Sequence, residues 1–462
     1  MLITRDKKFY RTVIALAIPM ILQNLITYSV GLADNIMIGS LGDSAVSGVY
    51  MAGQVQTVLQ VLSAGIEGGI LVLAAQYWGK KDRGSIQRIV SIGIWLSLAL
   101  GAVFTAVCAI APAGAVSVFT PESTVIASGR QYMEIICWSY IFFCITQSLI
   151  ISMRSVESAR IGLLVSICSL VIDVALNYLL IFGKLGLPAM GIRGAAIATL
   201  IARVCETVIM VLYVRFADKK LCFRFSMLKK LDRTLVRDFM HYGMPVIAGQ
   251  LVWGANLAGS SIIIGHFFGE SVITAVSIAG NLYNFMYVGM NGISGAVGIV
   301  IGKTVGSGDV SKIREYSRTV QLASVLLGIF TCAVFALARD PFIACYDITE
   351  SAVMYSRQFI NVLCVTCLGT CYQYTCLFGL VKSGGDVGFV FKNDTAFVFG
   401  VVLPSALITA LLGCPAWVVW ACLKCDQLLK GIVAFFKIRK YNWMKNLTRT
   451  DAPEAIPEAV QT

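Results

Sequence analysis

The chain has 462 residues, of which 57% are hydrophobic and only 13% are charged, about half the charged share of an ordinary soluble domain. Its mean hydropathy of +0.79 reflects more apolar surface than a water-soluble fold of this size can bury. The composition therefore excludes a cytosolic enzyme, a nucleic-acid-binding domain and a disordered regulator, and predicts an all-α polytopic membrane protein.

Apolar runs follow one another along the whole chain. A helix that crosses a bilayer needs about 20 apolar residues, so about twelve spans fit into this length. In chain order we expect them at 12–37, 47–77, 89–112, 131–152, 161–182, 191–214, 238–265, 272–301, 319–338, 358–381, 388–412 and 415–436. The predicted organisation is a six-helix bundle over 1–214, a basic cytoplasmic linker over 215–237, a second six-helix bundle over 238–436 and a cytoplasmic tail over 437–462.

The basic residues gather in alternate connections between the spans. With the N-terminus in the cytoplasm, 29 of the 37 lysine and arginine residues lie on the cytoplasmic side. Because cytoplasmic loops carry an excess of Lys and Arg, the net charge of +12 indicates topology and not a nucleic-acid partner. The first apolar run is too long for a cleavable signal peptide. We therefore expect a multi-pass plasma-membrane protein with both termini in the cytoplasm.

The two halves of the sequence repeat at a fixed offset of 227 residues. The matching segments are Leu41-Gly42-Asp43-Ser44-Ala45-Val46 with Phe268-Gly269-Glu270-Ser271-Val272-Ile273, Ala52-Gly53-Gln54 with Ala279-Gly280-Asn281, and Gly65-Ile66-Glu67-Gly68 with Gly292-Ile293-Ser294-Gly295. An even number of spans per half makes the repeat parallel, and two such bundles enclose a central cavity. Rocking of one bundle against the other would give alternating access, so the repeat favours a transporter over a structural protein.

Motifs for enzymatic chemistry are missing from the sequence. The fifteen cysteines are scattered through apolar runs, where they are typical small packing residues. With two histidines and no nucleophile, zinc or phosphate-loop motif, the sequence predicts neither an enzyme nor a bound cofactor.

Ionisable residues inside spans are costly and therefore indicate function. Asp34 lies in the first span, and Asp173 and Asn177 share one face of the fifth span because they are four residues apart. At a rise of 1.5 Å per residue, these three and Thr199 lie about 5–14 Å below the outer ends of their helices. We expect a cation-coupling site for H⁺ or Na⁺, the latter bound by Asp34, Asp173 and Asn177. An interfacial Asp34 and a purely structural Asp173 are the alternatives.

Other polar and aromatic residues are candidates for secondary roles. Glu67 lies about 30 Å along the second span, too far to join this cluster, and with Gln250 and Asp394 it is a candidate gating residue. The candidates for a substrate cavity are Tyr28, Gln56, Trp253, Tyr283 and Tyr287. Aromatic rings among them can hold flat cations by cation–π contact; ordinary helix packing or an interfacial belt is the alternative.

The order and spacing of several motifs resemble the multidrug and toxic-compound extrusion (MATE) antiporters over nearly the whole chain. The resemblance rests on Ile18-Pro19, Ala33-Asp34, Gly39-x-x-Gly42, Ala74-Ala75-Gln76-x-x-Gly79, Arg154, Asn177-Tyr178-Leu179-Leu180-Ile181-Phe182-Gly183, Gly191-x-x-Gly194-Ala195-Ala196-Ile197-Ala198-Thr199, Ser383-Gly384-Gly385-Asp386 and Trp443-Met444-Lys445-Asn446-Leu447. It implies a V-shaped pair of six-helix bundles that exports organic cations in exchange for H⁺ or Na⁺.

The resemblance also bears on single residues. Asp34 matches the family's acid on the first helix, whereas Asp173 and Asn177 match a helix-5 Asn and Asp with their identities exchanged. Many relatives carry a Glu after the proline of helix 7, where this chain has Gln250 as the nearest candidate. This departure weakens a cation site in the second half and leaves Asp386 and Asp394 without an obvious partner.

The expected partners are cationic or amphipathic small molecules and the lipid bilayer, with the chain acting as a monomer. A flippase for lipid-linked oligosaccharides or precursors from the same superfamily is the alternative function, for which more basic residues within the spans would be expected. A membrane-embedded transferase is a third class, but no His or Asp motif at a membrane face supports it.

Overall fold

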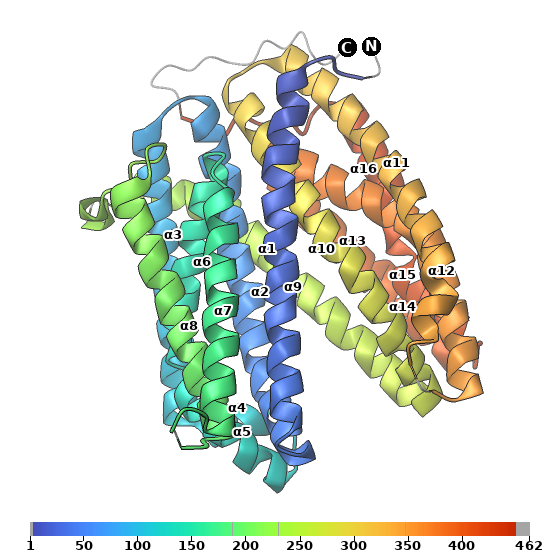
Figure 1. Ribbon diagram of the computed structural model, residues 1–462. Coiled ribbons are helices and arrows are strands. Elements are labelled where there is room, and N and C mark those ends of the chain that lie inside the picture. The colour runs from blue at the N-terminus through green and yellow to red at the C-terminus, as the bar shows by residue number, and fades with distance from the viewer. Residues whose placement is uncertain (1–2, 187, 230, 347, 450–462) are drawn as a thin grey trace. The chain divides into compact units, whose positions relative to one another are not determined.

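The computed structural model describes residues 3–449 except 187, 230 and 347, so the end of the expected tail lies outside the described residues. Within this part the chain is helical, and a single antiparallel bridge joins Gly385 to Met444. Ten of the described helices are long and apolar enough to cross a membrane, and the bent pair α5 and α6 adds an eleventh (Figure 1). The predicted all-α polytopic class is confirmed.

The helices follow the chain in the order that Figure 1 colours. The first half contains α1 (Lys7–Gly39), α2 (Asp43–Gly79), α3 (Arg83–Ile110), α4 (Pro112–Ser117), α5 (Ser123–Ile136), α6 (Ser139–Ser155), α7 (Arg160–Phe182), α8 (Ile192–Leu212) and the π-helix η1 (Tyr213–Ala217). After the 3-10 helix η2 (Phe225–Lys229), the second half contains α9 (Arg233–Phe267), α10 (Glu270–Gly306), α11 (Val310–Ile343), α12 (Glu350–Tyr374), the π-helix η3 (Thr375–Lys382), α13 (Val387–Phe397), the π-helix η4 (Val398–Val402), α14 (Leu403–Leu411), α15 (Ala416–Lys424) and α16 (Asp426–Arg439).

The internal repeat of the sequence is a repeat of helix boundaries. Helices α2 and α10 each have 37 residues, and both ends of α10 lie 227 residues after those of α2. The caps repeat as well: the Asp82 carboxylate accepts a hydrogen bond from the Ser85 amide at 3.0 Å, and the Asp309 carboxylate accepts one from the Lys312 amide at 3.2 Å. Such N-caps satisfy amide groups that have no partner within the helix.

The C-terminal ends of α2 and α10 meet at glycines that the repeat relates to each other. A Cβ on Gly79 would lie 1.9 Å from the Lys303 carbonyl oxygen, and a Cβ on Gly306 would lie 1.8 Å from the Gln76 carbonyl oxygen. Gln76 and Lys303 are themselves repeat-related positions. The contact is therefore reciprocal, and at both positions only a residue without a side chain fits.

The chain divides into two compact units. The N-terminal unit comprises Ile18–Ala74 and Asp82–Ile247, and the C-terminal unit comprises Met1–Ala17, Ala75–Lys81 and Ala248–Thr462. Each unit has its own apolar core. In the N-terminal unit the core includes Tyr140, and in the C-terminal unit it includes Phe359.

Two expected spans are broken. The run 131–152 falls on α5 and α6, which meet at a bend of 56°. At the bend the Cys137 carbonyl accepts a hydrogen bond from the Tyr140 amide at 3.2 Å and a second one from the Thr105 hydroxyl of α3 at 2.8 Å. A hydroxyl from a neighbouring helix thus adds to the local backbone bond at the bend, where apolar surroundings require polar groups to be paired within the protein. The run 415–436 falls on α15 and α16, which meet at Cys425.

The segment after α16 packs into the C-terminal unit. Trp443 is fully buried. Its ring packs on Gly384 so closely that a Cβ on Gly384 would lie 2.3 Å from the nearest ring atom. The Gln76 side chain accepts a hydrogen bond from the Leu447 amide at 2.7 Å and donates to the Ser383 carbonyl at 3.2 Å. The described residues of the expected tail, up to Arg449, are therefore a folded part of this unit.

Candidate functional site

Asp34, Asp173 and Asn177 lie together in the N-terminal unit. The Asn177 side-chain amide, on α7, donates to the Asp34 carboxylate of α1 at 2.7 Å and to Asp173, one turn away, at 3.2 Å. Asp173 and Asn177 are 1% and 0% exposed, and Asp34 is partly buried. One amide group therefore bridges two carboxylates in an apolar environment.

The bridge leaves buried oxygen atoms unused. Among the described residues, neither Oδ1 of Asp173 nor Oδ1 of Asn177 has a hydrogen-bond partner. Thr199, on α8, lies close enough to interact with the Asp173 carboxylate, although its own hydroxyl donates to the Ala195 carbonyl at 3.2 Å. Buried acceptors are normally satisfied, so this oxygen-rich cluster has room for a proton or a small cation.

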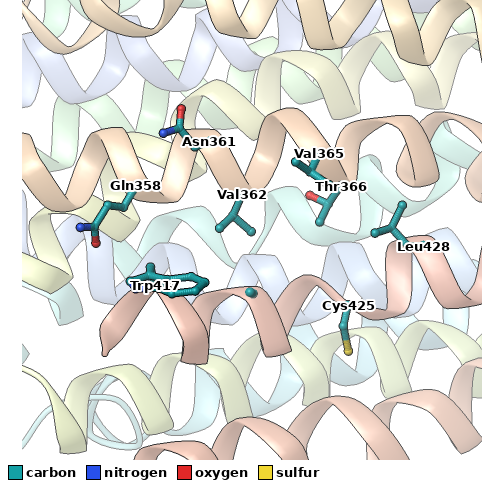
Figure 2. A pocket seen from close by; sticks show the side chains of 9 residues that line it. Gln358, Asn361, Val362, Val365, Thr366, Trp417, Cys425 and Leu428 are labelled. Atoms are coloured by element: carbon teal, nitrogen blue, oxygen red, sulfur yellow. The ribbon is translucent and has the colours of Figure 1, made fainter. Parts of the chain in front are cut away.

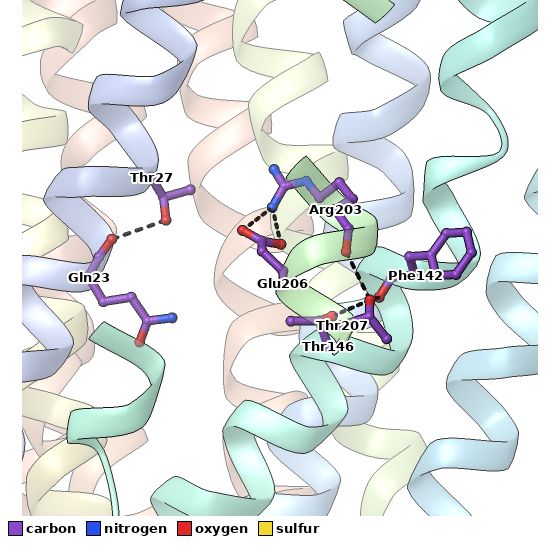
Figure 3. A network of polar contacts seen from close by, with 7 residues as sticks. All are labelled: Gln23, Thr27, Phe142, Thr146, Arg203, Glu206 and Thr207. Carbon is purple, nitrogen blue, oxygen red and sulfur yellow. Dashed lines mark hydrogen bonds and ion pairs between the residues drawn. The ribbon is translucent and has the colours of Figure 1, made fainter. Parts of the chain in front are cut away.

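A charged pair lies beside this cluster on α8 (Figure 3). Arg203 donates to both oxygens of the Glu206 carboxylate, at 3.1 and 2.9 Å, and its charge acts on Asp34 and Asp173. Among the described residues, three carboxylates therefore lie around the Arg203 guanidinium, those of Asp34, Asp173 and Glu206. This excess of negative charge attracts cations. Arg203 lies within the expected span 191–214, and Glu206 follows three residues later, a spacing at which side chains on a helix can pair.

The same helix is joined to α6 by hydroxyl groups. Figure 3 shows Thr146 and Thr207 in contact at 2.8 Å, and Thr207 also donates to the Arg203 carbonyl at 2.9 Å. These contacts hold the backbone that carries the Arg203–Glu206 pair.

Glu67 belongs to a different polar group. It accepts a hydrogen bond from the Ser63 hydroxyl at 2.9 Å and interacts electrostatically with Arg154. Arg154 donates in turn to the Gln23 side chain at 2.6 Å. No contact between Glu67 and the Asp34 cluster is found among the described residues, in agreement with the depth estimate from the sequence.

The absence of partners predicted for Asp394 and Asp386 is wrong. Asp394, on α13, pairs with Lys430 of α16 at 2.9 Å, and the same ammonium pairs with Asp426 at 3.0 Å. The partner lies 36 residues away in sequence on another helix, so no periodic pattern could reveal it.

Asp386 is paired outside the spans. Its carboxylate contacts Lys437 at 2.7 Å and Lys445 at 2.8 Å. Burial by itself raises the pKa of the Asp386 carboxyl, but the two ammonium groups outweigh burial and hold the pKa below its usual value.

The candidate cavity residues fall into separate groups. Trp253 and Tyr287 stack with ring centroids 6.2 Å apart, and Tyr283 and Tyr287 stack at 6.4 Å, all in the C-terminal unit. Tyr28, on α1, and Gln56, on α2, lie partly buried in the N-terminal unit. Gln250 lies partly buried on α9, one turn before Trp253.

A cavity of about 550 Å³ opens among α12, α15 and α16, and Figure 2 shows its largely apolar lining. The lining residues are Gln358, Asn361, Val362, Val365, Thr366, Trp417, Ala421, Cys425 and Leu428. None of the site residues predicted from the sequence lines it. Within the described residues, no group of three or more His, Cys, Asp or Glu is arranged to hold a metal ion.

Comparison with known proteins gives consistent matches. A family model described as MatE matches residues 19–179 and 245–410. The probable multidrug resistance protein NorM of Rhizobium meliloti strain 1021 is 26% identical over 332 residues, covering 71% of this chain and 70% of that protein. The uncharacterized transporter YisQ of Bacillus subtilis strain 168 is 22% identical over 457 residues, covering 95% of this chain and 96% of that protein.

Solved structures have the same fold. The MATE transporter VcmN of Vibrio cholerae matches with a TM-score of 0.85 at 16% identity, covering 95% of this chain and 98% of that one. A MOP superfamily transporter from Pyrococcus furiosus matches with a TM-score of 0.83 at 18% identity, covering 97% and 100%.

Proposed function

Because the chain belongs to the MatE family of multidrug efflux transporters, we propose that it exports organic cations and amphipathic drugs in antiport with H⁺ or Na⁺ by alternating access. The family makes it a multi-pass membrane transporter and not an enzyme. The proposal includes a plasma-membrane location, cytoplasmic termini, a monomer, and no cofactor besides the coupling ion. It also retains two bundles, 1–214 and 238–436, joined by the basic linker 215–237.

One observation carries the proposal for ion coupling. The Asn177 amide contacts both Asp34 and Asp173, and two buried side-chain oxygens of this group have no donor. Two adjacent carboxylates in an apolar site repel each other when both are ionised. Binding of one proton, or of one Na⁺ by Asp34, Asp173 and Asn177, would relieve that repulsion and partner the free oxygens.

The bound proton or Na⁺ would affect the position of α1 relative to α7. Asp34 reaches the cluster from α1, whereas Asp173 and Asn177 share α7. A proton or cation therefore changes the attraction between two helices and favours one of their arrangements. Only a ligand with different affinities for two states can shift their populations. Because α1 supplies just one of the carboxylates, a movement of α1 would change the affinity of this site for the ion.

The test is efflux of a fluorescent organic cation from proteoliposomes that contain the purified chain and no ATP. A pH gradient and a Na⁺ gradient are imposed separately, with the membrane potential clamped. We expect accumulation against a gradient under at least one of the two conditions. Transport that requires ATP, or that only equilibrates the dye under both gradients, would refute the antiport proposal.

A further inference from the structure

Three aromatic side chains in the C-terminal unit form a stacked row, here called the aromatic ladder: Trp253, Tyr287 and Tyr283. Their centroids are 6.2 and 6.4 Å apart, with ring planes within 20° of parallel. Tyr374 supports the middle ring, because its hydroxyl donates to the Tyr287 oxygen at 3.2 Å. Trp253 is 40% exposed, so the ladder is open at its Trp253 end.

An ammonium group lies over the inner end of the ladder. Lys424 Nζ is 4.4 Å from the centroid of the Tyr283 ring and 4.9 Å from that of Trp420. Among the described residues this ammonium has no ion pair or hydrogen bond. Since an aromatic face compensates a buried cation only in part, the charge of Lys424 would be stabilised further by an acidic ligand.

The nearby acids are already engaged. One oxygen of Asp426 contacts Lys430 at 3.0 Å, and the other accepts from the Gln427 amide at 2.8 Å. Asp394 also pairs with Lys430, at 2.9 Å. Asp426 therefore acts on Lys424 only through space.

The charges of this region do not balance. The two carboxylates are Asp394 and Asp426, and the ammonium groups that act on them are Lys430, Lys382 and Lys424. Of these five groups, two are negative and three are positive when all are ionised. Uncompensated charge in an apolar environment is costly, and one monovalent anion at Lys424 would balance these five groups.

We propose that the aromatic ladder and Lys424 form a binding site for aromatic monoanions, in which a carboxylate or similar oxyanion pairs with Lys424 and the ring packs on Tyr283 and Tyr287. The inference rests on the proposed export function and adds an anionic substrate class, at this site, to the organic cations proposed above. Its charge is opposite to that of the Asp34 cluster, where carboxylates are in excess.

Equilibrium dialysis with the purified full chain tests the proposal without any ion gradient. The probes are 2-naphthoate, the trimethylammonium compound with the same naphthalene ring, and octanoate, which has the carboxylate but no ring. We expect naphthoate to bind about tenfold or more tightly than either of the others, because it alone satisfies both the ammonium and the rings.

Variants locate the binding. Lys424→Gln should weaken naphthoate binding by about tenfold or more, the size of a lost charge-assisted contact, whereas Lys424→Arg should retain it. Tyr283→Leu should also weaken it. Lys392→Gln is the matched control, since it removes one positive charge from an exposed position on α13 and should leave the affinity unchanged.

The outcomes separate this site from the proposed antiport. Equal naphthoate affinity in wild type and Lys424→Gln, or preference of the wild type for the ammonium probe, would overturn the site even if ion-driven efflux of other dyes is observed. Selective loss in Lys424→Gln supports the site even if no gradient drives export. If Lys424→Gln fails to fold, Tyr283→Leu decides the question, provided that it elutes like wild type in size-exclusion chromatography. Equal naphthoate affinity in Tyr283→Leu and wild type would then overturn the site.

Discussion

Replacing Asp34 with asparagine changes the charge of the N-terminal cluster and very little of its shape. The new side chain keeps an oxygen that can accept the hydrogen bond from Asn177, which is 2.7 Å long in the wild-type protein. A hydrogen bond to a charged acceptor contributes about 1.5–3 kcal/mol and a neutral one about 0.5–1.5 kcal/mol. The expected loss is therefore about 1 kcal/mol.

A second contact offsets this loss. The new amide nitrogen of Asp34→Asn can donate to the Asp173 carboxylate, whose Oδ1 has no partner in the described structure. We therefore expect the variant to fold with a Tm within a few degrees of wild type, about 2–4 °C for each kcal/mol in a large domain. It should still bind substrate.

Coupling should fail nevertheless. Each tenfold ion ratio supplies about 1.4 kcal/mol for each exchanged monovalent ion, enough for about tenfold accumulation of substrate. Without a titratable group at position 34, the accumulation ratio should fall from about ten to one. The assay is gradient-driven efflux from proteoliposomes with matched protein content, and Asp173→Asn should behave in the same way.

The control for this experiment is the repeat-related residue Ser261, which is exposed on α9. Ser261→Ala should transport like wild type. Full gradient-driven accumulation by Asp34→Asn would refute the role of the cluster and move attention to Asp394 and Gln250.

Three further predictions test other features of the structure. Gly79→Ala should destabilise the protein by about 3 kcal/mol or more, because its Cβ would meet a carbonyl oxygen. Gly53→Ala in the same helix, with no atom within 4 Å of its Cβ, should be neutral or slightly stabilising in a thermal unfolding assay. Equal melting temperatures of the two variants would contradict the contact at Gly79. Lys430→Met should lower the free energy of unfolding by about 3–5 kcal/mol, because two buried carboxylates lose their cation. Adding Asp426→Asn should restore part of that loss. A double variant no more stable than Lys430→Met would count against the pairing. Glu67→Gln should reduce coupled efflux less than Asp34→Asn, since Ser63 can still donate to the amide oxygen, and an equal or larger loss at equal expression would argue for a shared site.

The sequence predicted the spans well where an apolar run has polar ends. The expected run 161–182 coincides with α7 almost to the residue, and the 227-residue offset reappears in α2 and α10. The break between α5 and α6 was not predictable, because no Gly or Pro marks Cys137–Trp138. The stabilising contact there comes from Thr105 on another helix.

The candidate site was predictable only in part for a similar reason. Helical spacing places Asp173 and Asn177 on one face, and depth along the helix brings Asp34 to their level. Pairing between distant helices leaves no such trace. Lys430 lies in the expected span 415–436, and its contact with Asp394 depends on how α13 and α16 pack, whereas Asp426, four residues earlier on the same helix, is at a spacing that allows an ion pair.

The contacts of Gln76 impose an order on biosynthesis. Its buried side chain at the end of α2 has its acceptor satisfied by the Leu447 amide, 371 residues later, and Trp443 closes over Gly384 in the same segment. A ribosome must therefore add 371 residues after Gln76 before this side chain finds that partner. Until then the amide must be hydrated or held by other factors, since a buried amide without partners is costly. Synthesis of the segment that carries Trp443 and Leu447, and not insertion of α16, is therefore the step that closes this part of the unit.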